Sequence, residues 1–140
     1  MQIHQSAEDY LECILKLSKV RPVVRSIDIA NEMNYSKPSI SVAMKNLRLN
    51  GYINVDESGF ITLTDSGMEI AASIYERHLL FREWFRYLGV DEKIAEEDAC
   101  KMEHTLSKET FAALKKHINS EMTGSRVNYA KNERKQGKNV

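Results

Sequence analysis

The chain has 140 residues, enough for one ordinary domain or two small ones, and its 20 basic and 20 acidic side chains balance to a net charge of zero. A chain that is 42% hydrophobic with no net charge has a folding composition, which excludes a disordered tail protein. The chain has no apolar run that could span a membrane, no signal-peptide pattern and too few cysteines for a disulfide scaffold, so we expect a cytoplasmic protein.

Two helices are predicted in the first 33 residues. Ser6, followed three residues later by Asp9, gives a capping-box-like start to the first helix. Apolar residues then recur at helical spacing as far as Ser18: Tyr10, Leu11, Ile14, Leu15 and Leu17. Pro22 ends that pattern, and a short second helix is expected over 27–33, starting at Arg25 or Ser26.

A third helix and a hairpin are predicted next. Ser36 caps this helix and Pro38 lies in its first turn, where a missing N–H costs little. The buried stripe has the spacing i, i+3, i+4 and i+7: Ile40, Ala43, Met44 and Leu47. Gly51 closes the helix, and short strands over 52–55 and 60–63 flank a hairpin loop. Helices followed by a hairpin indicate a winged helix-turn-helix DNA-binding domain over residues 1–63.

The rest of the chain predicts a helical domain over residues 64–120. Thr64 caps a long helix that runs to about Leu88, a second helix covers 91–107, and a last one starts at Ser107. The second half of the long helix is more apolar than a small domain can cover, which indicates a homodimer interface: Leu80, Phe81, Trp84, Phe85 and Leu88. Beyond residue 120 the periodicity fades, and we expect a polar basic tail over 121–140 that is frayed or disordered. The fold class is therefore mainly α with a small β-hairpin wing.

The neutral total argues at first sight against a nucleic-acid binder, but the charges are unevenly spread. Residues 36–50 carry three cations and no acid, whereas residues 91–109 carry seven acids and three cations. The outer face of the third helix is either a solvated face or a face that enters the major groove, and the turn and wing favour the second interpretation. The candidate DNA-binding residues are Ser36, Lys37, Pro38, Ser39, Ser41, Val42, Lys45, Asn46 and Arg48.

Metal-ligating side chains occur at helical spacing in two segments. Asp9 and Glu12 are spaced i, i+3 and share a face. Cys100, Glu103 and His104 are spaced i, i+3, i+4, and His78 is a further candidate; such a mixed O/N/S set suits a divalent transition metal.

Each candidate also has a purely structural alternative. Asp9 could serve as a helix cap, Glu12 as a solvated charge, His78 as a surface or interfacial histidine and Cys100 as a small core residue. Cys13 lies near the same face as Asp9 and is interpreted as a packed thiol rather than an extra ligand. Since there is no nucleophile motif, no Gly-rich phosphate loop and no HExxH, we do not expect an enzyme.

Several segments resemble those of the metal-dependent repressors typified by the diphtheria toxin repressor and the manganese transport regulator. They occur in the family's order and spacing from residue 6 to about 118: AEDYLE at 7–12, SKPSIS at 36–41, LTDSG at 63–67, RHLL at 77–80, LGVD at 88–91 and CKMEHTLS at 100–107. The resemblance is to the short, two-domain manganese-regulator type. It implies an N-terminal winged domain, a helical dimerisation domain and metal bound between them.

The resemblance assigns the metal ligands as Asp9, Glu12, His78, Cys100, Glu103 and His104. Position 100 departs from the manganese branch, which has glutamate there, and shares the cysteine of the iron branch. The iron branch has methionine where this chain has Asp9, and a carboxylate at an accessory site where this chain has Arg82. Three hard carboxylates outnumber one thiolate, so the donor set favours Mn²⁺, with Fe²⁺ next and Co²⁺ or Zn²⁺ accepted in vitro.

The function that follows is metal-dependent regulation of transcription. Metal binding would fix a homodimer in the geometry that reads a pseudo-palindromic operator on double-stranded DNA, and the resemblance implies repression of metal-uptake genes. Two alternatives remain: a winged-helix regulator that is metal-independent or responds to oxidation of Cys100, and a purely structural helical dimer.

Overall fold

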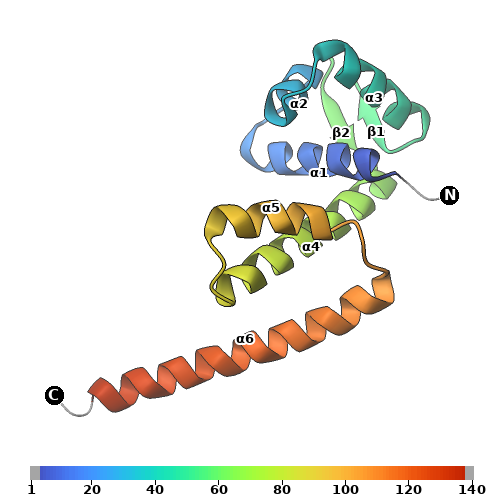
Figure 1. Ribbon diagram of the computed structural model, residues 1–140. Coiled ribbons are helices and arrows are strands. Elements are labelled where there is room, and N and C mark those ends of the chain that lie inside the picture. The colour runs from blue at the N-terminus through green and yellow to red at the C-terminus, as the bar shows by residue number, and fades with distance from the viewer. Residues whose placement is uncertain (1–3, 138–140) are drawn as a thin grey trace. The chain divides into compact units, whose positions relative to one another are not determined.

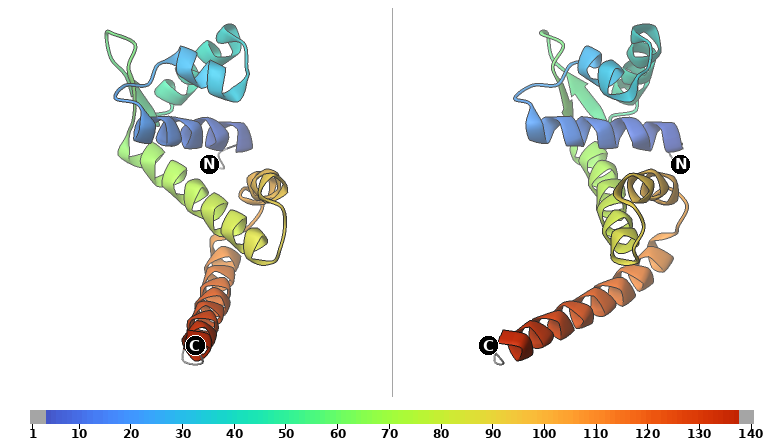
Figure 2. Two further views of the ribbon diagram at one scale, coloured as in Figure 1. Left: turned by 90° about the vertical axis from the view of Figure 1, so that its left-hand side faces the viewer. Right: turned by 60° about the vertical axis from the view of Figure 1, so that its left-hand side comes forward.

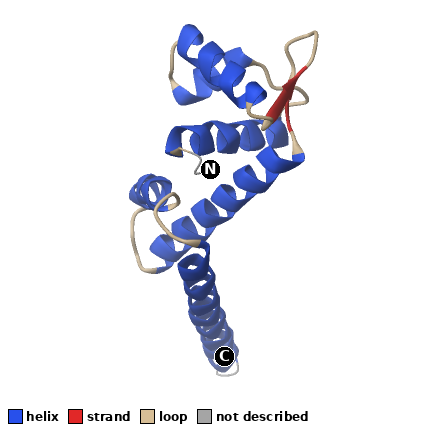
Figure 3. Cartoon of the chain, turned by 90° about the vertical axis from the view of Figure 1, so that its right-hand side faces the viewer, coloured by secondary structure: helices blue, strands red, loops and turns tan. Residues whose placement is uncertain are grey.

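The computed structural model describes residues 4–137, with side chains as far as residue 124. The chain divides into two compact units, residues 1–76 and residues 77–140. Helices predominate, with one short antiparallel hairpin in the first unit (Figure 3). The predicted fold class, mainly α with a β-hairpin wing, is confirmed.

The first unit has the element order of a winged helix-turn-helix. It contains α1 (Gln5–Val20), α2 (Ser26–Met33), α3 (Lys37–Leu49), β1 (Ile53–Val55), β2 (Ile61–Leu63) and the beginning of α4 (Asp65–Tyr87). The strands pair in antiparallel register, Ile53 with Leu63 and Val55 with Ile61. The two shorter helices and the hairpin lie on the same side of α1 (Figure 1, Figure 2).

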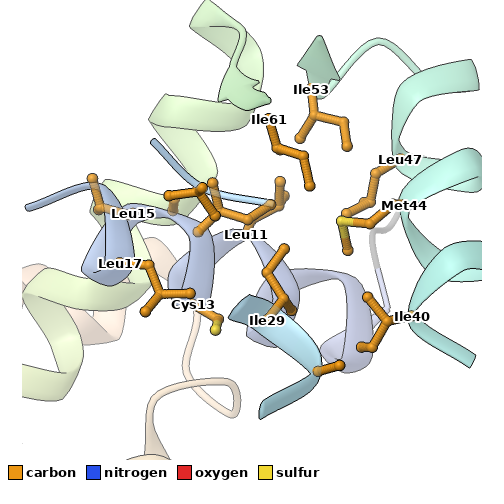
Figure 4. Close-up of a cluster of buried hydrophobic side chains, with 14 residues drawn as sticks. Leu11, Cys13, Leu15, Leu17, Ile29, Ile40, Met44, Leu47, Ile53 and Ile61 are labelled. Carbon is orange, nitrogen blue, oxygen red and sulfur yellow. The ribbon is translucent and has the colours of Figure 1, made fainter. Parts of the chain in front are cut away.

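The core of the first unit is formed by the apolar faces of these elements. Leu11 of α1 packs in one cluster with Ile40, Met44 and Leu47 of α3, which are all buried (Figure 4). Ala43, the fourth residue of the predicted stripe, is only partly buried. Ile53 and Ile61 add one buried side chain from each strand. Burial of large aliphatic side chains at this density is the main source of the unit's stability.

The helix starts agree with the sequence-based predictions except at the first helix. Ser36 caps α3, since its Oγ accepts a hydrogen bond of 3.3 Å from the N–H of Ser39. Thr64 caps α4 in the same way, with Gly67 N–H 3.2 Å from its Oγ1. The prediction that Ser6 caps α1 is wrong, because the helix already begins at Gln5 and no side chain caps it.

The second unit contains residues 77–87 of α4, followed by α5 (Glu92–Met102) and α6 (Lys108–Gly137). The helix predicted over 91–107 corresponds to α5, which ends at Met102, five residues earlier than predicted. The frayed or disordered tail expected over 121–140 is not what the structure has: the backbone of α6 remains helical to Gly137, and residues 138–140 lie outside the described part. Loss of apolar periodicity removes a face for burial, but without proline a helix of good formers need not end there.

The core of the second unit is aromatic. Phe81 of α4 packs edge-on against Phe111 of α6, with ring centroids 5.9 Å apart, and contacts buried Ala99 of α5. Of the residues predicted for a dimer interface, Phe81 is fully buried in this core and so offers no surface to a partner. Leu88 is 60% exposed, and Leu80, Trp84 and Phe85 are half-buried, so these remain the candidates for the interface.

Among the described residues, no helix combines the length and the apolarity needed to cross a lipid bilayer.

Candidate metal centre and DNA-binding surface

His78, on α4, is the centre of a polar cluster inside the second unit. Its side chain is 1% exposed, and each of its ring nitrogens faces a carboxylate. Nδ1 lies 2.9 Å from Oε2 of Glu103 and 3.7 Å from Sγ of Cys100, and Nε2 lies 2.8 Å from Oε1 of Glu96. The imidazole is therefore no surface histidine: it is buried among groups that ligate metals.

Glu103 joins the two histidines of the cluster. Its side chain is 1% exposed, with Oε2 on Nδ1 of His78 and Oε1 3.2 Å from Nε2 of His104. A buried carboxylate is costly unless it is paired with hydrogen-bond donors or cations. A hydrogen on a facing imidazole nitrogen can provide that pairing, and so can a divalent cation among the same atoms.

The chain reaches this geometry by ending α5 just before Glu103. The prediction that Cys100, Glu103 and His104 share one helical face holds for Cys100 and Glu103, because Glu103 is the C-cap and keeps helical dihedral angles, but it is wrong for His104, which follows the end of the helix. Arg77 holds the turn that follows, since its Nη1 donates to the carbonyls of Glu103, at 3.3 Å, and Leu106, at 2.6 Å. Sequence reasoning missed this role of Arg77, whose only local signal is its position directly before His78.

Glu96 is a second residue that sequence reasoning missed. It lies one turn before Cys100 on α5, so the spacing i, i+4 that places both on one face could have identified it. One candidate ligand atom from each of His78, Glu96 and Cys100 lies within 4.8 Å of the others. The outer oxygen of Glu96 is 3.5 Å from Nη1 of Arg82.

The donor set of the second unit fits a divalent transition-metal ion. Imidazole nitrogen comes from His78 and His104, carboxylate oxygen from Glu103 and thiol sulfur from Cys100, all within one small cluster. Carboxylates suit Mn²⁺, imidazoles suit iron and zinc, and a thiolate adds affinity for the softer ions. These residues can therefore hold a metal, and the mixture does not by itself select one.

The other two predicted ligands, Asp9 and Glu12, lie on α1 in the first unit. Asp9 is half-buried, while Glu12 is 6% exposed and its Oε1 is 3.7 Å from Nζ of Lys16. The solvated-charge alternative for Glu12 is thus wrong. That Asp9 and Glu12 ligate the metal stays a prediction.

Cys13 is packed in the core of the first unit, beside Leu11 and Ile14, with 7% of its surface exposed. Burial away from water raises the pKa of its thiol to about 11, with Glu32 adding to the effect and Lys16 opposing it. This agrees with its interpretation as a packed thiol.

The two cysteines are expected to differ in reactivity. At pH 8 the folded protein should be alkylated by iodoacetamide at Cys100, which is exposed, and only slowly at Cys13, which is buried and whose raised pKa leaves it protonated. Mass spectrometry of tryptic peptides over time measures both rates. Denatured protein, in which both thiols should react alike, is the control, and equal rates in the folded protein would contradict the burial of Cys13.

The predicted DNA-binding surface is fully accessible. Every candidate on or before α3 is exposed, from Ser36 to Arg48, while the opposite face of the helix is buried. Val42 is 62% exposed although it is apolar, which suits contact with a thymine methyl group. The Oγ of Ser36 donates to the Oγ of Ser39 at 2.8 Å, so this hydroxyl is used in capping the helix.

Two protein-family models match the chain, one over each part. Residues 2–59 match the N-terminal DNA-binding domain of the iron-dependent repressors, and residues 64–123 match their metal-binding and dimerisation domain. An uncharacterised HTH-type transcriptional regulator of Methanocaldococcus jannaschii is 39% identical over 114 residues, which cover 79% of this chain and 90% of that protein. The transcriptional regulator MntR of Escherichia coli O157:H7 is 32% identical over 108 residues, covering 77% and 70%.

Solved structures agree with these matches. The manganese regulator SloR superposes with a TM-score of 0.70 at 30% identity, covering 85% of this chain and 55% of that one. A manganese-dependent transcriptional repressor in complex with manganese gives 0.73 at 25% identity, covering 81% and 52%. The chain spans about half the length of these solved regulators. It belongs to the iron-dependent repressor family, with that family's N-terminal DNA-binding domain followed by its metal-binding and dimerisation domain.

Proposed function

We propose that this protein is a metal-dependent transcriptional repressor of metal-uptake genes, which binds a pseudo-palindromic operator as a homodimer. The observation that carries the proposal is the buried His78–Glu103–His104 cluster with Cys100 beside it, in a chain that also has a winged helix-turn-helix. A DNA-binding regulator acts where the chromosome is, so we place it in the cytoplasm.

The proposed ligand set comprises the four residues of this cluster together with Asp9 and Glu12, which the family resemblance and their shared face on α1 support. The three carboxylates outnumber the one thiolate and suit Mn²⁺, which we propose as the physiological metal, with Fe²⁺ second because of the thiol of Cys100. Co²⁺ and Zn²⁺ should also bind in vitro, because the thiol of Cys100 adds affinity for these softer ions.

The metal ion, when bound, supplies positive charge that several ligands share and so favours the arrangement in which they converge. The chain's own residues prepare for this: Arg77 holds the turn that presents Glu103 and His104, and α4 presents His78 beside them. Because metal and operator would favour the same state of the dimer, operator DNA should tighten metal binding by the same factor that metal tightens DNA binding.

The decisive experiment is a DNA-binding titration carried out without oxygen. Fluorescence anisotropy of a labelled promoter fragment, with Mn²⁺, Fe²⁺, Co²⁺ and Zn²⁺ in turn and with a chelator as reference, measures which ion supports binding. Tight binding with Mn²⁺ and weak binding with chelator is the expected result. Equal affinity in every condition would overturn metal control.

The second candidate function is a winged-helix regulator that senses oxidation through Cys100. It is favoured by the exposure of Cys100 and the 3.7 Å between its Sγ and Nδ1 of His78. This function predicts a DNA affinity that a chelator does not change but that mild peroxide treatment changes reversibly. The peroxide effect should occur in the native protein and not in Cys100→Ser. That result would favour this function over the first.

Replacing Lys45 by alanine tests the DNA-binding face. Lys45 is exposed on α3 with its charge free to meet a phosphate, so its loss should weaken binding to every sequence alike and reduce the slope of log K against log salt by about one unit. Anisotropy titrations at four salt concentrations measure the slope. The control is Lys116→Ala, which removes an exposed cation from α6 and should leave the slope unchanged. If the slope is also unchanged in Lys45→Ala, Lys45 contacts no phosphate.

A further inference from the structure

The two ring nitrogens of His78 face two different groups of side chains. Nδ1 faces Glu103, at 2.9 Å, and Cys100, at 3.7 Å, which are both among the proposed ligands. Nε2 faces Glu96, at 2.8 Å, which is not. Since a histidine binds a metal through one nitrogen and keeps a hydrogen on the other, the partner of the second nitrogen decides how the ring is presented.

Glu96 is itself held in place by a cation. Its Oε1 contacts Nε2 of His78, and its other oxygen, Oε2, lies 3.5 Å from Nη1 of Arg82. Arg82 follows His78 by one turn of α4, while Glu96 comes from α5, so the pair also links the two helices. The side chains of Arg82 and Glu96 are 32% and 42% exposed and that of His78 is 1% exposed, so the chain of contacts leads from the surface of the unit to the buried ring.

We propose that Glu96, held by Arg82, is a positioning residue that accepts the Nε2–H of His78 and thereby directs Nδ1 to the metal. This inference rests on the proposed function, since it needs the centre to bind a divalent cation. A hydrogen on Nε2 leaves the Nδ1 lone pair aimed at Glu103 and Cys100, which is where the other donors lie. In this arrangement Glu96 faces the other ring nitrogen, Nε2, and supports the ligand without being one.

Metal affinity of matched variants tests the proposal. Glu96→Ala removes the acceptor and should weaken Co²⁺ binding, followed by visible absorption, by about 10- to 100-fold. Glu96→Gln keeps an oxygen that can accept the Nε2–H and should recover most of that loss. Glu97→Ala removes the same charge from an exposed neighbour on α5 and should bind as the native protein does.

Nuclear magnetic resonance of ¹⁵N-labelled protein reads the ring directly. In the native protein loaded with Zn²⁺, the ¹⁵N shifts of His78 should show Nδ1 bound to metal and Nε2 carrying hydrogen. In the metal-free protein the Nε2–H signal should be visible and protected from exchange with water, and it should be lost in Glu96→Ala. This last readout does not depend on metal, so it tests the Glu96 contact by itself.

The outcomes separate the inference from the function beneath it. Metal bound through Nε2, or Glu96→Gln as weak as Glu96→Ala, would make Glu96 a direct ligand and overturn the inference. An equal loss of metal affinity in Glu97→Ala would mean that the effect comes from removing a negative charge anywhere on α5, and it would also overturn the inference. If the native protein binds no divalent ion, the proposed function is overturned. If the native protein binds the ion and Glu96→Ala binds it with the same affinity, only the inference is overturned.

Discussion

Replacing Glu103 by glutamine should abolish metal-dependent DNA binding and leave a folded protein. The carboxylate is 1% exposed and each of its oxygens contacts a different imidazole, at 2.9 and 3.2 Å. The amide is almost the same size but is neutral, and it offers only one oxygen to a cation. Metal affinity should therefore fall by more than about 100-fold, the upper range for a residue that only supports a ligand.

Two measurements on Glu103→Gln keep loss of binding apart from loss of structure. Anisotropy with Mn²⁺ and with chelator gives the metal dependence of DNA binding, and circular dichroism with size-exclusion chromatography gives the fold and the oligomeric state. Glu97→Gln, which changes an exposed acid on α5, the helix that ends just before Glu103, is the matched control and should respond to metal as the native protein does. A normal metal response in Glu103→Gln would show that the cluster is not the regulatory centre.

Replacing Gly67 by alanine should produce a large loss of stability. A Cβ atom at this position would collide with the backbone carbonyl of Tyr52 and would also touch a methyl group of Leu63. Neither the carbonyl nor the helix can move easily, because Thr64 N–H donates to the same Tyr52 oxygen at 3.1 Å and Thr64 Oγ1 donates to Gly51 O at 2.7 Å. We expect the free energy of unfolding to fall by about 3 kcal/mol, at the upper end for overpacking.

Urea denaturation followed by circular dichroism measures this change, with Gly124→Ala as the control. Gly124 also lies in a helix, but nothing is within 4 Å of the position of its missing Cβ, so alanine there should stabilise the protein by about 0.5–1 kcal/mol through helix propensity. Similar free energies for Gly67→Ala and the native protein would mean that the junction between hairpin and α4 is looser than the structure has it.

The sequence predicted the fold well where the determinants are local. Ser36 and Thr64 cap the helices they were expected to cap, and three of the four residues of the predicted α3 stripe are buried, with Ala43 partly buried. The end of α5 was missed because no proline or glycine marks it. It is set by Arg77, which captures carbonyls 26 and 29 residues further along, and a local pattern contains no trace of such a contact.

The residues proposed as metal ligands could be predicted from the sequence, but the contact of Glu96 with His78 could not. Spacing along one helix and the family resemblance identified Cys100, Glu103 and His104, and the structure gathers them with His78. Glu96 was missed because an acidic helix offers many carboxylates, and only the approach of α4 to α5 selects the one that reaches His78. The tertiary packing of the second unit therefore contains the information that the sequence pattern lacked.

The capping role of Ser36 limits how much the protein can read on DNA. Because its hydroxyl donates to Ser39, Ser36 contributes structure. On the proposed DNA-binding face, discrimination between bases would then fall to a few side chains such as Ser41, Val42 and Asn46. Each favourable base contact distinguishes sequences by about 1–3 kcal/mol, and a genome offers about a million or more competing sites. Under the proposed function, one copy of α3 would therefore contact too few bases to select a promoter, and the protein would have to bind two half-sites at once.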